Sequence, residues 1–151
     1  MKKIICMCVA AAFMGGLAAA ADSNDQTARE ILGIERASLE GWLKGNPDPM
    51  LATLDPEVSY VHVMTDKRLD GLVAVKALFE PYRGMPLFDS FEMDGAKVQV
   101  SGNVAVLTYQ LVQHNGPATN RWNGTQVYVR RSAGWKVIHT HWSQANPPAQ
   151  R

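Results

Sequence analysis

Two histidines stand one residue apart near the C-terminus, within the segment GWKVIHTHWS that spans residues 134–143. In an extended strand alternate side chains share a face, so His139 and His141 are predicted to share a face with Trp135 and Val137. We expect this face to point inward, beneath a layer of helices. Neighbouring imidazoles in such a place can bind a metal ion, transfer protons, line a ligand pocket or hydrogen-bond to nearby backbone.

Strand-borne metal sites use the spacing of His139 and His141, because neighbouring side chains on one face can converge on one ion. Such a site needs a third ligand. His62 can supply it only if its strand lies beside the last strand, and the last strand itself carries no Asp or Glu. We therefore predict no metal site and no cofactor.

Proton transfer near neutral pH also suits histidine, provided that a second group orients the ring. The predicted catalytic residues are His62, His139 and His141. Side chains on the predicted strands are suitable hydrogen-bond partners for them: Tyr60, Tyr109, Tyr128 and Ser143. The alternative is that backbone carbonyls and neighbouring hydroxyls and amides satisfy the imidazoles, which would fix the strand without any chemistry.

The segment RWNG, residues 121–124, begins another predicted strand. Arg121 can anchor a carboxylate or phenolate, and Asn123 can orient a polar ligand, whereas Trp122 is expected to pack against Trp142. The predicted ligand-binding residues are Tyr60, Tyr109, Arg121, Asn123 and Tyr128. In another interpretation Tyr109, Tyr128 and Trp142 lie on the outer face of the sheet, where they pair two subunits.

The first 21 residues have the layout of a cleavable secretory signal: Lys2 and Lys3, then an apolar run, then small residues. The mature chain is therefore expected to be exported to the periplasm. Both cysteines, Cys6 and Cys8, lie in this segment, so the mature chain is expected to be free of disulfides. Removing the two lysines from 15 basic residues leaves 13 against 14 acidic ones. This nearly neutral net charge gives no electrostatic reason to expect binding to nucleic acid, or to a membrane once the signal segment is cleaved.

Helical spacing of apolar residues predicts a first helix over residues 27–44, and two Asp-Pro steps bracket a short second one around residues 50–54. A strand over 58–64, a hairpin and a third helix over 72–82 follow. From residue 87 onward four β-rich runs separated by Gly-containing turns predict an antiparallel meander. Three helices followed by such a sheet indicate an α+β domain.

This order of elements resembles the nuclear transport factor 2-like superfamily, and four partly overlapping segments carry the likeness. KVQVSGNVAVLTYQLV and TQVYVRRSAGWKVIHTHWS resemble the last strands of the association domain of calcium/calmodulin-dependent kinase II, and RWNGTQVY and HTHWS resemble bacterial SnoaL-like proteins. The resemblance implies a cone-shaped, cystatin-like fold, with three N-terminal helices packed on a curved, mainly antiparallel sheet. It also implies a homodimer and a pocket that works without metal.

The sequence departs from these relatives in two respects. The kinase association domain has a pocket arginine at the position aligned with Gln126, so its acidic-ligand preference does not carry over. Ketosteroid isomerases need a general-base carboxylate, and the nearest acids to the first predicted strand, Asp66 and Asp70, fall in a turn.

We therefore expect a signal peptide (1–21), a flexible lead-in (22–26), one SnoaL-like domain (27–145) and a loose tail (146–151). The predicted function is binding of a small apolar or aromatic molecule, with acid/base turnover of the isomerase, cyclase or hydratase type. The alternative is a non-catalytic oligomerisation or binding module like the kinase association domain.

Overall fold

The computed structural model describes residues 14–145, with side chains described from residue 23 onward. The helices are α1 (Met14–Leu43), α2 (Asp48–Thr53), α3 (Leu72–Phe79) and the 3-10 turn η1 (Glu80–Tyr82). The strands are β1 (Leu54–Val61), β2 (Leu69–Asp70), β3 (Ser90–Ser101), β4 (Val104–Asn115), β5 (Ala118–Arg131) and β6 (Gly134–Gln144).

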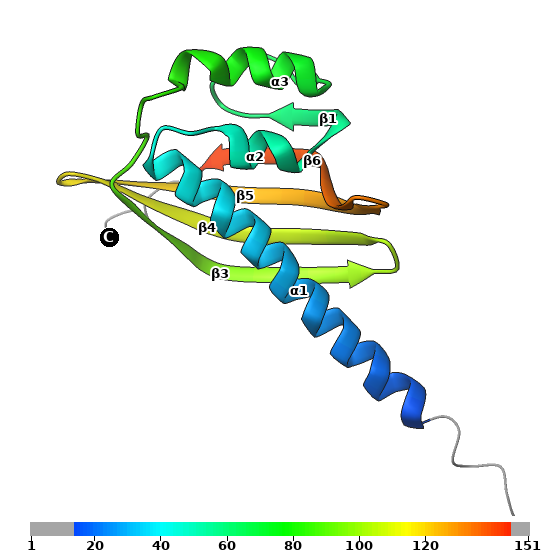
Figure 1. Ribbon diagram of the computed structural model, residues 1–151. Helices are drawn as coiled ribbons and strands as arrows, with labels where there is room; N and C mark the ends of the chain where they lie inside the picture. The colour runs from blue at the N-terminus through cyan, green and yellow to red at the C-terminus, as the bar shows by residue number, and fades with distance from the viewer. Residues whose placement is uncertain (1–13, 146–151) are drawn as a thin grey trace, which may run out of the picture.

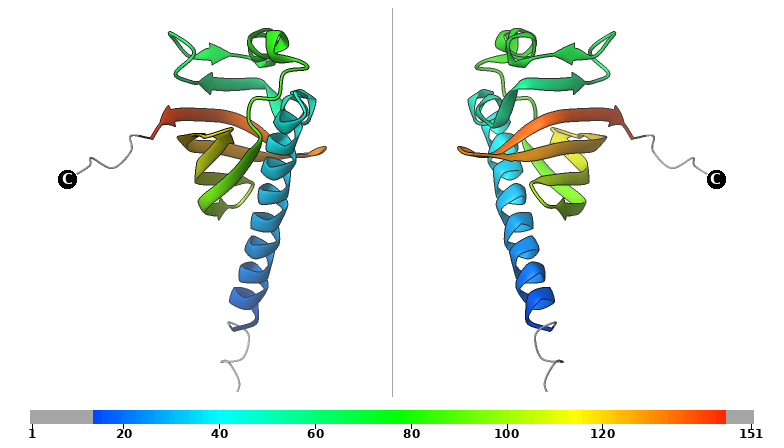
Figure 2. Two further views of the ribbon diagram at one scale, coloured as in Figure 1. Left: turned by 90° about the vertical axis from the view of Figure 1, so that its left-hand side faces the viewer. Right: turned by 90° about the vertical axis from the view of Figure 1, so that its right-hand side faces the viewer.

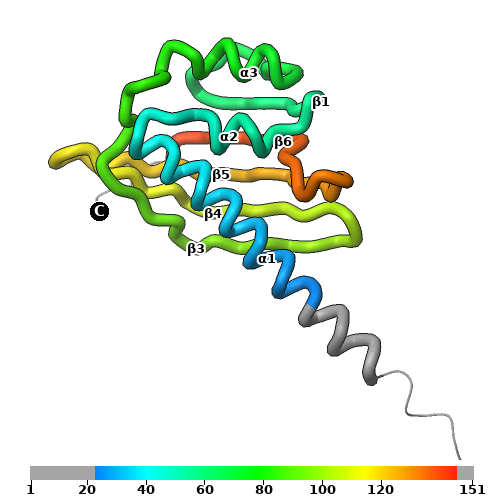
Figure 3. The backbone as a smooth tube through the Cα atoms, viewed as in Figure 1, coloured from blue at the N-terminus to red at the C-terminus, as the bar shows by residue number. Residues whose placement is uncertain are grey.

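All six strands belong to one sheet, in the order β2-β1-β6-β5-β4-β3. Strands β3 to β6 form the predicted antiparallel meander, and these segments follow one another across the sheet in Figures 1 and 3. Strand β1 pairs with β2 antiparallel and with β6 parallel, so the first and last strands lie side by side. The α+β class and the curved, mainly antiparallel sheet are confirmed.

The helices cover one face of this sheet. Helix α1 crosses that face diagonally, α2 follows at its upper end, and α3 lies against β1 (Figures 1 and 2). We call the face toward α1 the inner face and the opposite one the outer face. The largest side chains that are completely buried come from the helices, β1 and the inner face: Ile31, Val58, Val75, Leu107, Tyr128 and Val137.

Helix α1 is longer than predicted, because residues 22–26, expected as a lead-in, continue it. Its buried stripe includes Ile31, Glu35, Leu39 and Trp42, which recur every three or four residues and therefore face the sheet together. The helix ends at Leu43 and the chain turns at Gly45, whose φ is 65° and where an added Cβ would lie 2.5 Å from the backbone nitrogen of Met85. Only glycine fits this close, left-handed turn.

The predicted signal segment and tail fall largely outside the described residues, since residues 1–13 and 146–151 are not described. Within residues 14–145, no helix is both long enough and apolar enough to cross a lipid bilayer.

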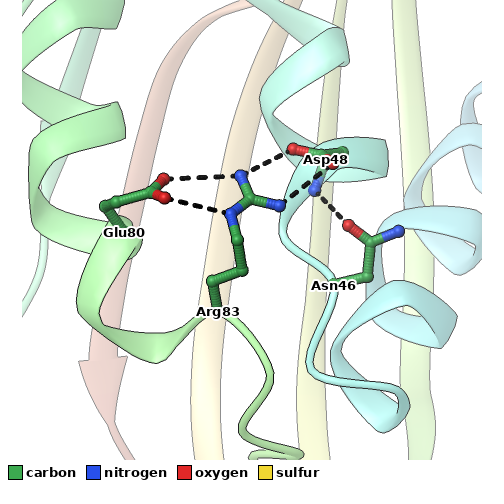
Figure 4. Close-up of polar contacts among 4 residues, drawn as sticks. All are labelled: Asn46, Asp48, Glu80 and Arg83. Atoms are coloured by element: carbon green, nitrogen blue, oxygen red, sulfur yellow. Dashed lines mark hydrogen bonds and ion pairs between the residues drawn. The ribbon is translucent and has the colours of Figure 1, made fainter.

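An exposed cluster of ion pairs joins the two short helical regions (Figure 4). Arg83 donates to Asp48 at 2.8 and 3.0 Å and to Glu80 at 3.1 Å, so it connects the start of α2 with η1. Hydrogen bonding to Arg83 lowers the pKa of Asp48. Ion pairs as exposed as these add little to the free energy of unfolding, so the cluster mainly fixes the position of α2 relative to η1.

Strand β6 contains a β-bulge that decides which side chains face inward. Its pairing with β5 shifts between two neighbouring positions: Val137 lies opposite Tyr128, whereas His139 lies opposite Val127. Ile138 is therefore the extra residue. Because side chains alternate along a strand, one extra residue exchanges the faces of everything that follows.

Candidate functional site

A cavity of about 270 Å³ lies between the helices and the inner face of the sheet. Met64, which is 48% exposed, is one of its walls and marks where the cavity meets solvent. The other lining residues come from α1, α2, α3, four strands and the loops after β1 and before β3: Glu35, Ser38, Leu39, Trp42, Met50, Leu54, Tyr60, His62, Phe79, Leu87, Phe88, Leu111, Gln113, Trp122, Gln126, Thr140 and Trp142. Ligand sites usually span about 300–1,000 Å³, so this cavity lies just below the usual range and has room only for a small molecule.

Aromatic rings form much of the wall. Phe79 of α3 packs against Trp42 at 5.2 Å and, edge to face, against Tyr60 at 5.5 Å between ring centroids. On the sheet, Trp142 packs edge to face on Tyr109 at 5.5 Å. Gly124 lies opposite Trp142 on β5, and its missing side chain leaves the space that the indole occupies.

The buried carboxyl of Glu35 is the acidic group of the cavity. Glu35 is 4% exposed, and its oxygens accept hydrogen bonds from the hydroxyls of Tyr109 and, at 3.0 Å, Tyr128. Burial raises the pKa of Glu35, and the two tyrosine hydrogen bonds offset only part of this rise. Burial and the adjacent Glu35 also raise the pKa of both tyrosines, which remain neutral donors.

Three polar side chains form one row across the inner face. Gln126 pairs with Thr140, and Thr140 pairs with Tyr60, in register across β5, β6 and β1. Thr140 is 3% exposed, and its hydroxyl has no hydrogen-bond partner among the residues that the structure describes. A buried hydroxyl without a partner costs about 1–3 kcal/mol, so a ligand that bonded to it would recover this cost.

His62 lies at the cavity wall, as predicted, between two aromatic rings. Its ring stacks on Tyr60 at 6.0 Å and lies 5.3 Å from Trp122. Partial burial lowers its pKa, and its Nδ1 accepts a hydrogen bond of 3.0 Å from the backbone N–H of Met64. The neutral ring therefore carries its proton on Nε2, where it can donate to a ligand. A catalytic role for His62 stays a prediction.

The predicted inward orientation of His139 and His141 is wrong. They share one face, but the bulge at Ile138 turns that face outward and places Thr140 and Trp142 in the cavity instead. His139 bonds to Ser59 Oγ at 2.8 Å on the outer face, and His141 is exposed. Neither ring reaches the cavity, so neither can act on a ligand there.

Arg121 and Asn123 also lie outside the cavity. They alternate with Trp122 and Gly124 along β5, and both are exposed on the outer face. Arg121 donates to Gln110 Oε1 at 3.1 Å, on the neighbouring strand. The alternation that puts Trp122 in the cavity wall necessarily turns both polar neighbours away from it.

The three predicted ligand-binding tyrosines lie on the inner face. Tyr60 lines the cavity directly, whereas Tyr109 and Tyr128 bond to Glu35 behind its wall. The alternative placement of Tyr109, Tyr128 and Trp142 on the outer face is therefore wrong. Direct contact of Tyr109 or Tyr128 with a ligand stays a prediction.

Within residues 23–145, no group of three or more His, Cys, Asp or Glu side chains lies close enough to share a metal ion. His62 directly follows β1, the strand beside β6, but it lines the cavity while His139 and His141 face outward.

Helices packed on one face of a curved sheet, with a cavity between them, define a pocket-forming domain of the nuclear transport factor 2-like type. Residues 39–147 match the SnoaL-like domain family, and the chain belongs to this family. The resemblance stated above is thereby confirmed.

Several solved structures are similar. A candidate ketosteroid isomerase from Parabacteroides distasonis is 30% identical, with a TM-score of 0.69, over 78% of this chain and 86% of that one. An NTF2-like protein of unknown function from Pseudomonas putida is 19% identical, with a TM-score of 0.72, over 83% and 91% of the two chains. The CaMKII hub of S. rosetta is 24% identical, with a TM-score of 0.64, over 78% and 95%. No curated protein matches the sequence significantly.

Proposed function

We propose that this protein binds a small, largely apolar or aromatic molecule in the cavity and that Glu35 exchanges a proton with it. The observation that carries the proposal is the buried carboxyl of Glu35 at an apolar cavity, bonded to the neutral hydroxyls of Tyr109 and Tyr128. A carboxyl with a raised pKa can act as acid or base near neutral pH, where an ordinary one is fully ionised.

Isomerisation, dehydration and cyclisation are reactions that such a group can perform. In the simplest sequence, ionised Glu35 removes a proton from one atom of the ligand and returns it to another. The hydroxyl of Thr140 or Nε2–H of His62 donates to the ligand oxygen on which negative charge develops. The similar structures support this choice, because they include a candidate ketosteroid isomerase and a candidate dehydratase from Streptomyces avermitilis.

An NMR titration with 2-naphthol tests the binding step. Its hydroxyl can bond to Glu35 or Thr140 while its rings contact Trp122 and Trp142. We expect saturable shifts of the Trp122 and Trp142 indole N–H signals and loss of binding in Leu111→Trp, which fills the cavity. His139→Ala is the control, since it removes an imidazole from the outer face and is expected to bind as the wild type does. Shifts confined to the outer face, or unchanged binding by Leu111→Trp, would contradict the proposal.

The alternative of an assembly module rests on the outer face. Val106 of β4 lies directly opposite Val127 of β5 there, with Thr108 and Thr125 as the next outward pair. We propose that two copies pair through this partly apolar surface to form a homodimer, which is compatible with a ligand in the cavity. Light scattering on Val106→Glu/Val127→Glu, which is expected to be monomeric and folded, tests it. A wild-type protein that is monomeric at high concentration would contradict it.

Export remains a proposal that rests on the first 21 residues. The expected form in the native host is a periplasmic chain that begins near Asp22. The intact mass of protein from a periplasmic extract tests this, and a chain that retains Lys2 and Lys3 would contradict it.

A further inference from the structure

Given the proposed function, the charged side chains that line the cavity restrict the charge that its ligand can carry. No lysine or arginine is among the described residues that line it, and Glu35 is the acidic residue in the wall. The titratable groups around Glu35 are Tyr109 on β4, Tyr128 on β5, Tyr60 on β1 and His62 directly after β1. All four are neutral near pH 7, so ionised Glu35 has no positive partner within the cavity.

The bonding capacity of Glu35 leaves room for a ligand. A carboxylate has about four acceptor positions on its two oxygens, and the tyrosine hydroxyls occupy one on each. An anionic ligand would be repelled by this group and would meet no cation. A cationic ligand would supply the missing charge.

The aromatic walls provide the second element of a cation site. Trp42, Tyr60, Phe79, Trp122 and Trp142 line the same cavity as Glu35 and come from α1, β1, α3, β5 and β6. The face of an aromatic ring attracts a cation, most strongly for tryptophan, and cages of such rings bind alkylated ammonium groups. A compact primary ammonium is strongly hydrated, whereas alkyl groups reduce the cost of removing water.

We propose that the ligand of this cavity is an organic cation, an alkylated amine with an apolar or aromatic body, whose positive charge pairs with Glu35 among the aromatic rings. The inference rests on the proposed function for its binding site and adds the charge of the ligand. A tertiary amine fits the proton exchange proposed above: as a neutral base it takes the proton of Glu35 and forms the ion pair in the cavity.

Proton linkage follows from this pairing. Burial keeps Glu35 protonated to a higher pH than usual in the free protein. A cation must displace that proton, so its affinity rises with pH up to the pKa of Glu35 in the free protein and is constant above it. A neutral ligand of the same shape displaces no proton and shows no such rise.

Two probes of matched shape test the proposal: phenyltrimethylammonium, and tert-butylbenzene, in which carbon replaces the charged nitrogen. Calorimetry and NMR on the wild-type protein would compare their affinities from about pH 5 to about pH 8, an interval above the ordinary pKa of glutamate. We expect the cation to bind about tenfold or more tightly than its neutral counterpart near pH 8, with an advantage that shrinks toward pH 5.

Glu35→Gln supplies the variant test, because the amide keeps the size of the carboxyl and cannot ionise. It is expected to lose the advantage of the cation, so that phenyltrimethylammonium and tert-butylbenzene bind to it with similar affinities. Equal affinities of the two probes, or an advantage that survives in Glu35→Gln and at every pH, would overturn the cation proposal. If tert-butylbenzene alone binds at Trp122 and Trp142, the proposed function stands and the cation proposal fails; if neither probe reaches the cavity, both fail.

Discussion

Replacing Gly124 by alanine tests the packing that shapes the cavity. A Cβ at this position would lie 2.7 Å from Cζ3 and 2.8 Å from Cη2 of the Trp142 indole. Ordinary contact begins near 3.4 Å, so the rigid ring must move by about 0.7 Å, the difference between the two distances. Trp142 packs on Tyr109, which bonds to Glu35, so the displacement reaches the candidate site.

We expect Gly124→Ala to lower the free energy of unfolding by about 1–3 kcal/mol, the usual cost of overpacking. Gly33→Ala is the matched control: the same methyl group is added within α1, where nothing lies within 4 Å. It should raise the free energy of unfolding by about 0.5–1 kcal/mol through helix propensity. Urea denaturation measures both, and near-ultraviolet circular dichroism reports the movement of the indole. Equal effects of the two substitutions would refute the reasoning.

Three further predictions concern the cavity. Burial raises the pKa of Glu35 above its ordinary 4.5, so the contribution of this carboxyl to stability is fully present below that pH and declines as pH rises to the folded-state pKa. Urea denaturation across pH should show this decline in the wild type. If the decline persists in Glu35→Gln, another group causes it. Thr140→Val removes the unpartnered hydroxyl and should raise the free energy of unfolding by about 1 kcal/mol while weakening 2-naphthol binding; a loss of stability would show that the hydroxyl has a partner. His62→Gln should weaken 2-naphthol binding and His141→Ala should not, as NMR titration measures, and the reverse result would contradict the placement of the rings.

The helix and strand patterns in the sequence predicted the architecture well, because each pattern repeats over many residues. The α1 stripe and the four long β-rich runs each repeat their pattern over several turns or alternations. The parallel pairing of β1 with β6 was not predicted, since it joins segments about 80 positions apart in sequence and no local pattern encodes that contact.

The predicted site was partly wrong for a local reason. A single extra residue, Ile138, reverses the face of every later side chain in β6, and alternation alone cannot reveal it. One signal was present: Trp142, a large aromatic residue, stands an odd number of positions after Val137, so simple alternation would place the two side chains on opposite faces. Large aromatic residues usually lie on a buried face, so the position of Trp142 indicated that the alternation changes within the strand.

Glu35 was missed although its position is informative. It lies four residues after Ile31 and four before Leu39, in the middle of the apolar stripe of α1. A carboxyl in such a stripe must be buried and needs hydrogen-bond donors. Its donors, Tyr109 and Tyr128, come from strands far along the chain, so only the fold shows that they meet.

The central claim is that Glu35 is a buried carboxyl whose protonation a cavity ligand controls. Carbon-13 NMR of the Glu35 side-chain carboxyl, followed across pH with and without phenyltrimethylammonium, measures this directly. We expect a pKa of Glu35 well above the ordinary 4.5 in the free protein and a lower value when the cation is bound. Titration near 4.5 in both states would contradict it.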